Sequence, residues 1–304
     1  MPANTLKLGG DLVIRRLGFG SMRLTGRGVW GEPRDEALAV RVLRKAVAAG
    51  VTLIDTADSY GPQVSEHLIA KALHPYPDDL VVATKGGYLR DGPWQWRPDG
   101  RPEHLRKALE GSLRRLRLER VDLYYLHRVD PAVPLEESVG ALAELAEEGK
   151  IRQIGISEVG VEALERAGRI TPVAAVQNRY NLGERAHEPV VRACESTGTA
   201  FVAWFPLARG MLVRARIRAL RRVAARRGAT PAQVALAWLL HRSPAIVPIP
   251  GTSSVEHLHE NLGARELVLD ERDLQELEGA RPPREAPAFV KRAGKLVLSR
   301  LPGR

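Results

Sequence analysis

The sequence predicts a parallel α/β barrel, the (β/α)8 or TIM-barrel fold, with an N-terminal β-hairpin and a short C-terminal helix and tail. Three observations support this prediction. Eight short apolar segments rich in β-forming residues recur along the chain, and amphipathic helical segments separate several of them. Reactive side chains follow several of these segments, and strand ends are where a barrel builds its active site. Eight strands also suffice to close a filled barrel.

The elements follow one another regularly. An initial hairpin covers about residues 6–14, with a Gly-Gly-Asp turn. The predicted strands are residues 16–22, 51–55, 80–85, 121–127, 151–157, 172–178, 200–206 and 245–251. The clearest helical segments between them are residues 34–50, 101–117, 134–149 and 188–198. Three of these helices end in glycine, the expected stop signal: Gly50, Gly149 and Gly198.

The last third of the chain completes the barrel. Thr230 as N-cap and Pro231 at the first helical position predict a helix over 230–242, covering the seventh strand. A further helix is expected over 270–280. The Pro-rich tail from about 282 either folds over a barrel mouth or stays mobile. We expect one domain spanning residues 1–304.

A doubly wound open sheet is the competing α/β fold. It requires a glycine fingerprint, G-x-G-x-x-G, that follows an early strand and leads into a helix. The sequence GFGSM at residues 18–22 does not provide this pattern. The barrel is therefore the favoured prediction.

Composition indicates an ordinary globular protein. The chain has 304 residues, of which 44% are hydrophobic and 27% charged. No apolar stretch approaches the length of about 20 residues that a membrane span requires, and the first residues lack a signal-type apolar core. A single cysteine, Cys194, excludes an intrachain disulfide framework and a cysteine-cluster metal site. We expect a cytoplasmic protein that is a monomer or a weak homo-oligomer.

The net charge of +10 raises the alternative of a nucleic-acid-binding protein. The densest basic cluster runs from Arg214 to Arg227, and no aromatic residues interleave with it for base stacking. Arginines spread over helices in this way are typical of a solvated helix surface. We therefore expect no nucleic-acid partner. Binding that weakens steeply with salt would favour the alternative.

Four side chains stand out as candidates for catalysis. Asp55, Lys85 and His127 each end or follow a predicted strand, and Tyr60 lies five residues after Asp55. Taken singly, each has a structural explanation: a helix cap, a packing tyrosine or a hydrogen-bonded core histidine. A lysine at the end of an apolar strand is costly to bury without a partner. Together on one face of a barrel, the four predict an active site.

The chemistry of these groups is coherent. Tyr60 is the candidate proton donor to a carbonyl oxygen, and a free phenol has a pKa of about 10. The Lys85 ammonium is expected to lower that pKa, with Asp55 holding the amine in place. His127 is expected to orient the carbonyl oxygen. No metal is required, but no side chain supplies a hydride, so a nicotinamide cofactor is implied.

The sequence also resembles the aldo-keto reductases over nearly its whole length. The resemblance rests on successive blocks in the family's order: IDTADSYG, VVATKGG, DLYYLHRVDP, IRQIGISEV, VAAVQNRYN and PIPGTSSVEHLHENL. It implies a (β/α)8 barrel, NADPH-dependent carbonyl reduction and the catalytic tetrad Asp55, Tyr60, Lys85 and His127. The residues implied to bind the cofactor are Met22, Ser157, Glu158, Gln177, Trp204, Pro206, Leu207, Gly210, Gly251, Thr252, Ser253, Ser254, His257 and Asn261.

The chain departs from the family pattern at several of these positions. Glu158 stands where many members have asparagine, and Trp204 stands where many stack a tyrosine on the nicotinamide. His257 and Gly251 occupy positions where arginine and lysine often hold the 2′-phosphate, which leaves NADH open as a cofactor. The segment between residues 210 and 230 is also short, so a long loop over the cofactor is not expected.

Aromatic residues in the strand-end loops predict an apolar substrate pocket. The candidates are Trp30, Tyr88, Trp94, Trp96 and Phe205. Such a pocket favours a bulky or aromatic aldehyde. The sequence is most similar to a bacterial branch of the family that includes pyridoxal reductases, which suggests pyridoxal. The alternative function is a nicotinamide-binding regulatory or sensor subunit without significant turnover, which need not retain the complete tetrad.

Overall fold

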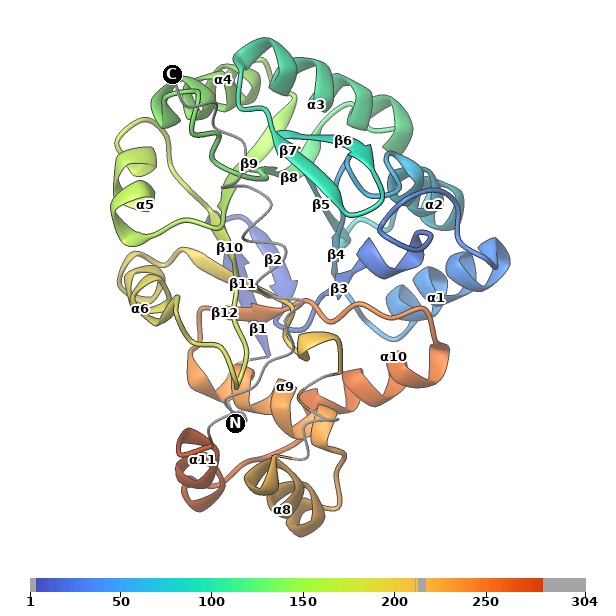
Figure 1. Ribbon diagram of the computed structural model, residues 1–304, viewed down its shortest axis with the longest axis vertical. Helices are drawn as coiled ribbons and strands as arrows, with labels where there is room; N and C mark the ends of the chain where they lie inside the picture. Colours follow the sequence, from blue (N-terminus) through green and yellow to red (C-terminus); the bar gives the residue numbers. More distant parts are fainter. Residues whose placement is uncertain (1–3, 211, 213–216, 281–304) are drawn as a thin grey trace, which may run out of the picture.

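Eight parallel strands form the centre of the computed structural model, which describes residues 4–210, 212 and 217–280 (Figure 1). Each strand pairs with the next in the sheet order β3-β4-β5-β8-β9-β10-β11-β12. Their bounds are β3 Phe19–Gly20, β4 Leu53–Asp55, β5 Val81–Gly86, β8 Val121–Leu126, β9 Ile151–Ser157, β10 Ala175–Arg179, β11 Ala200–Trp204 and β12 Ile246–Pro248. All eight lie within or overlap the predicted segments, which confirms them.

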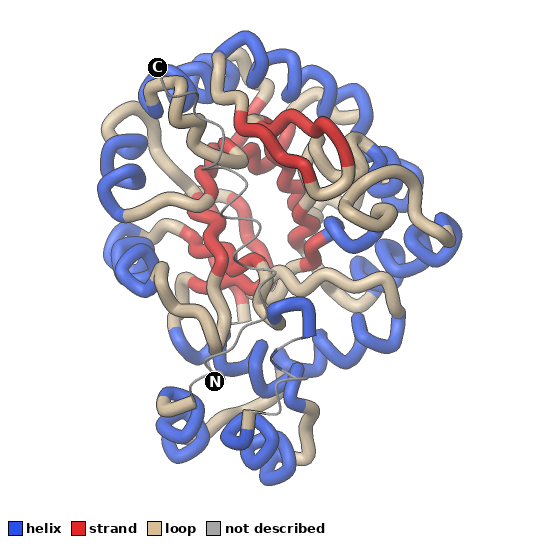
Figure 2. The backbone as a smooth tube through the Cα atoms, in the orientation of Figure 1, coloured by secondary structure: helices blue, strands red, loops and turns tan. Residues whose placement is uncertain are grey.

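Backbone hydrogen bonds join the first strand of this sheet to the last. Gly18 N donates to Pro248 O over 3.0 Å, and Gly20 N donates to Pro250 O over 3.5 Å. Figure 2 shows the result, a ring of strands surrounded by helices. The predicted (β/α)8 barrel is therefore confirmed, and the carboxyl ends of its strands share one face.

Helices follow the strands around the outside of the barrel. Their bounds are α1 Glu36–Ala48, α2 Val64–Leu73, α3 Pro102–Leu116, α4 Leu135–Glu147, α5 Val161–Gly168, α6 Glu188–Thr197, α8 Arg218–Arg227, α9 Pro231–Arg242, α10 Val255–Leu262 and α11 Glu271–Glu278. Short 3-10 turns occur at η1 Ser21–Leu24, η2 Ala208–Gly210 and η3 Gly263–Arg265. The predicted start of α9 is confirmed, because the Thr230 hydroxyl accepts a hydrogen bond from Gln233 N in a complete capping box.

The predicted N-terminal hairpin covers the amino end of the barrel. It consists of β1 Thr5–Leu8 and β2 Leu12–Arg15, which pair antiparallel. Leu8 and Ile14 are fully buried and belong to the same apolar cluster as residues of β4, β5 and β8. The hairpin therefore closes one end of the barrel and leaves the carboxyl ends of the strands for a site.

A second hairpin, which the sequence analysis did not predict, lies in the long loop after β5. It is formed by β6 Tyr88–Gly92 and β7 Gln95–Pro98, which pair antiparallel with an irregular register. Alternation is weak in this segment, because tryptophan, arginine and proline are mixed within it. In Figure 1 the hairpin lies over the carboxyl side of β5 and β8.

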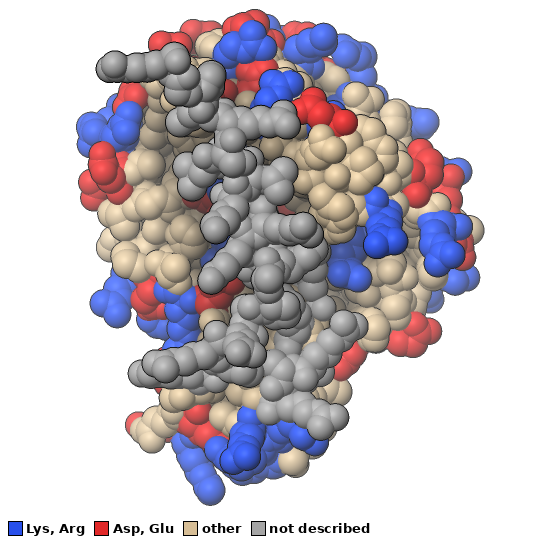
Figure 3. Space-filling view, in the orientation of Figure 1, with Lys and Arg blue, Asp and Glu red and all other residues tan. Residues whose placement is uncertain are grey.

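Most arginines of α8 are exposed, which agrees with the predicted solvated helix surface, and several of them also form ion pairs with α11. Arg226 and Arg227 form ion pairs with Asp273 of α11, whose carboxylate is fully buried. Arg222 pairs with Glu276 on the same helix. Figure 3 shows basic and acidic side chains interspersed over the described part of one face. Arg214 and the tail from about 282 lie outside the described residues.

Within residues 4–210, 212 and 217–280, no helix has the length and hydrophobicity needed to cross a membrane, and no group of three or more His, Cys, Asp or Glu residues could hold a metal ion. The one cysteine, Cys194, is free and buried in α6.

Gly251 allows the two ends of the sheet to meet. A Cβ atom at this position would lie 2.4 Å from the carbonyl oxygen of Gly20, which is backbone and cannot rotate away. Gly20 is constrained in turn, because its own Cβ would lie 2.9 Å from Ile249 O. The glycine at 251, one of the departures from the family pattern, is therefore required by the barrel closure.

Gly251→Ala is expected to lower the free energy of unfolding by about 1–3 kcal/mol, because the added methyl group forces β3 and β12 apart. Gly140→Ala in α4 is the matched control, since a Cβ there meets nothing within 4 Å. That control should be neutral or gain up to about 1 kcal/mol from helix propensity. Urea unfolding of both variants measures the difference. Equal stability of the two variants would contradict the closure argument.

Candidate active site

The four predicted catalytic side chains meet at the carboxyl end of three adjacent strands. Asp55 is the last residue of β4, Lys85 is the penultimate residue of β5, and His127 directly follows β8. Tyr60 lies in the loop between β4 and α2. Because β4, β5 and β8 are neighbours in the sheet, residues far apart in sequence are brought onto one face.

Asp55 and Lys85 form a buried ion pair. The Lys85 Nζ lies 2.6 Å from Asp55 Oδ1 and also donates to Thr56 O over 2.7 Å. Gln177 Nε2 on β10 donates to the other carboxylate oxygen, Oδ2, over 2.7 Å. Asp55 is 2% exposed and Lys85 is 0% exposed. The expected pairing is present, and Gln177 adds a third member from the opposite side of the barrel.

Burial and pairing act in opposite directions on this ion pair. Desolvation raises the pKa of Asp55, and Lys85 and Gln177 oppose that shift. Desolvation lowers the pKa of Lys85, and Asp55 opposes that shift. The charged form of each residue is therefore favoured by the other, which makes the pair a single electrostatic unit.

Tyr60 is 7% exposed, and its ring centroid lies 5.3 Å from the Lys85 Nζ. Burial raises the pKa of the phenol well above its ordinary value, and nearby Asp55 adds to the effect. The prediction that Lys85 lowers the pKa of Tyr60 is therefore wrong, because the net shift is upward. Desolvation of the phenol exceeds the effect of nearby cations. The cation that opposes the shift is Arg90. Tyr60 consequently stays protonated at neutral pH, the state that a proton donor requires.

His127 is neutral at physiological pH. Desolvation lowers the pKa of its imidazole well below the ordinary value, and Lys85 and Arg128 reinforce this direction. Its Nδ1 lies 3.3 Å from the Ser59 hydroxyl; with that hydroxyl as donor, Nε2 carries the ring proton. Its ring lies 5.8 Å from the Tyr60 ring in an edge-on arrangement. His127 therefore suits a hydrogen-bond donor to a carbonyl oxygen better than an acid.

Two of the predicted pocket aromatics lie against these catalytic groups. The Tyr88 and Trp96 rings lie 4.7 Å and 6.2 Å from the His127 ring, and Trp96 also lies 6.3 Å from the Tyr60 ring. Both come from the hairpin β6–β7. The hairpin that the sequence analysis missed therefore brings aromatic side chains to the catalytic groups.

The other three pocket candidates lie around this cluster. The Trp30 ring lies 5.6 Å from the Arg90 guanidinium, which in turn stacks on Trp96. Phe205 lies beyond β11, with the Arg179 guanidinium 4.5 Å from its ring. Trp94 is 46% exposed between β6 and β7. Their roles in substrate binding remain predictions.

The residues predicted to bind a nicotinamide line the ends of β9, β10 and β11. The Ser157 hydroxyl donates to the carbonyl oxygen of Gln177 over 2.8 Å. Glu158 accepts from the Trp204 indole N–H and from Arg179 N, both over 2.6 Å. The glutamate and the tryptophan that depart from the family pattern are thus bonded to each other, and the carboxylate fixes the orientation of the indole.

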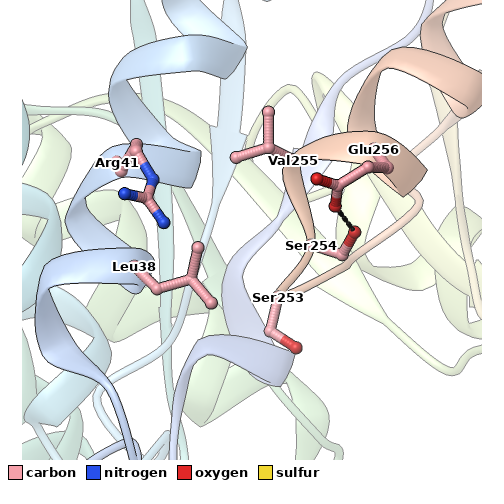
Figure 4. Close-up of a pocket in the computed structure, with 6 residues that line it drawn as sticks. All are labelled: Leu38, Arg41, Ser253, Ser254, Val255 and Glu256. Atoms are coloured by element: carbon pink, nitrogen blue, oxygen red, sulfur yellow. Dashed lines mark hydrogen bonds between the residues drawn. The ribbon is translucent and has the colours of Figure 1, made fainter.

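The predicted adenosine-binding segment follows β12 and begins α10. Ser254 caps this helix by accepting a hydrogen bond from His257 N, and Thr252 accepts from Ser254 N. Thr252 and Asn261 are buried, whereas Ser253 and His257 are exposed. A groove of about 390 Å³ lies between this segment and α1, with Arg41 on its far side (Figure 4).

Four further predicted cofactor residues lie in loops on the same face. Met22 in η1 packs against the cluster that contains Tyr60. Pro206 is buried and Leu207 is half-buried in the segment after β11. Gly210 has a φ of 77° at the end of η2. The short segment that follows it lies partly outside the described residues.

Comparison with known proteins assigns the family. The model of the aldo/keto reductase family matches residues 16–282, most of the chain. The chain belongs to the aldo/keto reductase family. It is therefore an oxidoreductase, and the family's nicotinamide-dependent chemistry agrees with the tetrad found at the barrel mouth.

Individual relatives are similar over nearly their whole length. Pyridoxine 4-dehydrogenase from Escherichia coli is 45% identical over 285 residues, which cover 92% of this chain and 99% of that protein. A thermostable aldo-keto reductase solved with the inhibitor epalrestat has a TM-score of 0.81 at 34% identity, covering 90% of this chain and 98% of that one. An aldo-keto reductase from Klebsiella pneumoniae, solved with NADPH, has a TM-score of 0.77 at 30% identity, covering 94% and 98%.

Several charged residues near the aldo/keto reductase site were not predicted from the sequence. Arg41 faces α10 from α1, more than 200 residues away in sequence. Arg90 lies in an unpredicted hairpin. Glu66 on α2 is fully buried, where it accepts from Thr84 and Arg115. The sequence does show a glutamate between apolar residues of a helical segment. That pattern predicts a buried carboxylate only when the residue that pairs with it is also known.

Asp58 is a buried acid between the catalytic loop and this Glu66 cluster. Desolvation and the nearby Glu66 carboxylate raise the pKa of Asp58 to about 8. Its Oδ1 has no hydrogen-bond partner among the described residues. The folded protein therefore holds a proton on Asp58 that the unfolded chain releases near its ordinary pKa of 3.8.

Asp58→Asn is expected to stabilise the protein increasingly as pH rises from about 5 to about 8. The raised folded-state pKa means that the native state binds more protons than the unfolded state in this window, so wild-type stability falls as pH increases. Asparagine does not titrate, so the variant does not lose stability in this way. Urea unfolding at several pH values measures the free energy of unfolding of wild type and variant, with the exposed Asp78→Asn as control. A difference from wild type that does not change with pH would rule out this titration.

Proposed function

We propose that this aldo/keto reductase reduces an aldehyde to an alcohol with NADPH, and that pyridoxal or a similar aromatic aldehyde is its substrate. The observation that carries the proposal is the grouping of a protonated Tyr60 and a neutral His127 beside the buried Lys85–Asp55 pair. Reduction of a carbonyl group needs a proton at oxygen and a hydride at carbon. A nicotinamide cofactor, when bound, supplies the hydride.

The chain's own groups divide the remaining work. Tyr60 delivers its proton to the substrate's carbonyl oxygen as general acid, and the resulting phenolate is stabilised by nearby cations. Lys85 carries one of those positive charges, and Asp55 fixes its amine. His127, through Nε2, donates a hydrogen bond that holds the carbonyl oxygen within reach of Tyr60. The apolar walls from Tyr88 and Trp96 exclude water around these steps.

The residues present fit a nicotinamide dinucleotide. At one end, Trp204 offers an indole face held by Glu158, beside the polar Ser157 and Gln177 on the neighbouring strands. At the other end, the groove beside α10 contains hydroxyl groups and the first amides of a helix, which suit a phosphate. These residues would hold the two ends of the cofactor.

A 2′-phosphate on that cofactor would find a cation in Arg41. The guanidinium lines the α10 groove opposite Ser253 and Ser254. The Ser254 hydroxyl, together with His257 and Arg41, lowers the pKa of Glu256 in the same groove, so Arg41 acts electrostatically at this position. Arg41 thus supplies from α1 the charge that His257 and Gly251 do not, which supports NADPH over NADH.

The proposed substrate rests on the aromatic surroundings and on one relative. Tyr88 and Trp96 present ring edges and faces beside His127, a surface suited to a planar aromatic aldehyde. The Escherichia coli relative is named a pyridoxine 4-dehydrogenase. Oxidation at the 4′ alcohol of pyridoxine is the reverse of pyridoxal reduction, so the same site would serve both directions.

We further propose that residues 1–304 act as one domain in the cytoplasm, as a monomer or weak homo-oligomer, without a nucleic-acid partner. The described strands and helices belong to one barrel, which supports a single domain. The lone buried Cys194 suits a reducing compartment. The ion pairs between α8 and α11 reduce the charge that α8 could offer to a polyanion.

Tyr60→Phe is expected to lower the rate of aldehyde reduction by about 10²–10⁴-fold, because the proton donor is lost while the ring remains. NADPH oxidation is followed with pyridoxal, 4-nitrobenzaldehyde, methylglyoxal and aldoses. NADPH affinity, measured by quenching of tryptophan fluorescence, should be nearly unchanged. Tyr76→Phe is the control, since that hydroxyl donates to Leu116 O away from the site.

Two outcomes would contradict the proposal. Unchanged turnover in Tyr60→Phe would remove Tyr60 as proton donor. A wild-type protein that binds NADPH but reduces none of these carbonyl compounds would favour the regulatory or sensor subunit.

Arg41→Ala is expected to raise the Kd for NADPH about threefold to tenfold, the scale of one partly exposed charge-assisted contact, and to leave NADH binding unchanged. The control is Arg44→Ala on the same helix, whose guanidinium donates to Ala72 O instead. Fluorescence titration of each variant with NADPH and with NADH measures the two Kd values. If Arg41→Ala weakens both cofactors equally, the guanidinium does not contact the 2′-phosphate.

A further inference from the structure

Arg90 on β6 makes an unusually complete set of hydrogen bonds to backbone carbonyl groups. A guanidinium carries five N–H donors, and five carbonyl oxygens accept from this one. The acceptors are Gln95 O for Nε, at 2.9 Å; Val29 O and Ser59 O for Nη1, at 2.9 and 2.6 Å; and Gly28 O and Gly92 O for Nη2, at 3.1 and 3.2 Å. All five donor positions are thus used.

These bonds connect three loops that surround the catalytic groups. One acceptor, Ser59, immediately precedes Tyr60 and contacts His127 through its hydroxyl. Two acceptors belong to the loop before α1, and two are the strand residues on either side of the β6–β7 turn. The guanidinium plane also lies 3.6 Å from the Trp96 ring centroid. One side chain therefore fixes the catalytic loop relative to the aromatic walls.

Arg90 also brings a positive charge close to the proton donor. The acceptors of its five hydrogen bonds are neutral carbonyls, so no carboxylate cancels its charge through those bonds. Desolvation lowers the pKa of Arg90 to about 10, which still leaves it charged at neutral pH. The effect on Tyr60 is reciprocal, since Arg90 is the cation that opposes the burial-induced rise in the pKa of the phenol.

We propose that Arg90 is a positioning residue for carbonyl reduction, which fixes the loop of Tyr60 against the β6–β7 hairpin and places a positive charge beside the phenol at neutral pH. The inference rests on the proposed function of Tyr60 as proton donor. With its five N–H groups occupied, the guanidinium has none left for a substrate. Its contribution is to hold Tyr60 and to stabilise the phenolate that remains after proton transfer.

Three variants separate the two components of this role. Arg90→Met removes both the charge and the hydrogen bonds. Arg90→Lys keeps a charge but has only three donors on a flexible stem. Arg97→Met is the matched control on β7, where the arginine is 58% exposed and pairs with Asp91 at the surface. Each is purified and checked for native unfolding before its kcat and KM with NADPH and pyridoxal are measured at neutral pH.

Arg90→Met is expected to lower kcat about 10-fold to 100-fold, the scale of a small misplacement of reacting groups, with NADPH affinity retained. The loss should appear in kcat and not in the Kd for NADPH, because the guanidinium uses its donors on backbone carbonyls. Arg90→Lys keeps a positive charge beside the phenol and should recover part of the lost kcat. Arg97→Met should match wild type. A folded Arg90→Met with wild-type kcat, or an Arg90→Lys no more active than Arg90→Met, would overturn the proposal.

A second measurement does not depend on turnover. Hydrogen–deuterium exchange of the free protein should show faster exchange at residues 28–31 and 59–61 in both Arg90 variants than in wild type. Unchanged exchange there would overturn the positioning role. If the wild-type protein reduces no carbonyl compound, the proposed function is contradicted. Faster exchange in the Arg90 variants than in wild type would still support Arg90 as an anchor of these loops.

Discussion

The site depends on one buried ion pair. Lys85 and Asp55 are almost wholly removed from water, and the charged form of each is stabilised by the other, which lies within hydrogen-bonding distance. Holding that geometry requires two rigid supports, and adjacent strands of a closed barrel provide them. Gln177 approaches the carboxylate from a strand farther around the barrel, so the pair also ties together opposite sides of the ring. Tyr60 and His127 are arranged around this charge pair.

Much of the fold was predictable because its physical causes are local. Apolar strand segments, helix caps such as Thr230 and glycine stops repeat at a regular spacing, and the eight strands were found where predicted. The grouping of the four candidate catalytic side chains was predictable for a related reason. A charged side chain at the end of an apolar strand, such as Lys85, has few structural explanations.

The remaining features depend on contacts between distant segments. The β6–β7 hairpin has little alternation, and Arg90 binds carbonyl groups, which carry no side-chain signature in a sequence. Arg41 and the α10 segment meet only because α1 and α10 are neighbours around the closed barrel. The direction of the Tyr60 pKa shift was mispredicted because the extent of its burial is a property of the packed molecule. From the sequence, Gly251 is the loss of a lysine that could hold a phosphate. In the structure, the carbonyl oxygen of Gly20 lies 2.4 Å from where a Cβ atom at position 251 would be placed.

Glu158 connects the two halves of the active site. Its carboxylate accepts from Trp204 and from Arg128, and Arg128 also donates to the phenol of Tyr88, whose ring lies against His127. The surface proposed for a nicotinamide ring and the surface proposed for a carbonyl compound are thus joined through one carboxylate. If a bound cofactor changes the affinity for substrate through this connection, thermodynamic linkage requires that bound substrate change the affinity for cofactor by the same factor. A coupling carried by these contacts would therefore depend on Glu158 as well as on direct contact between the two ligands.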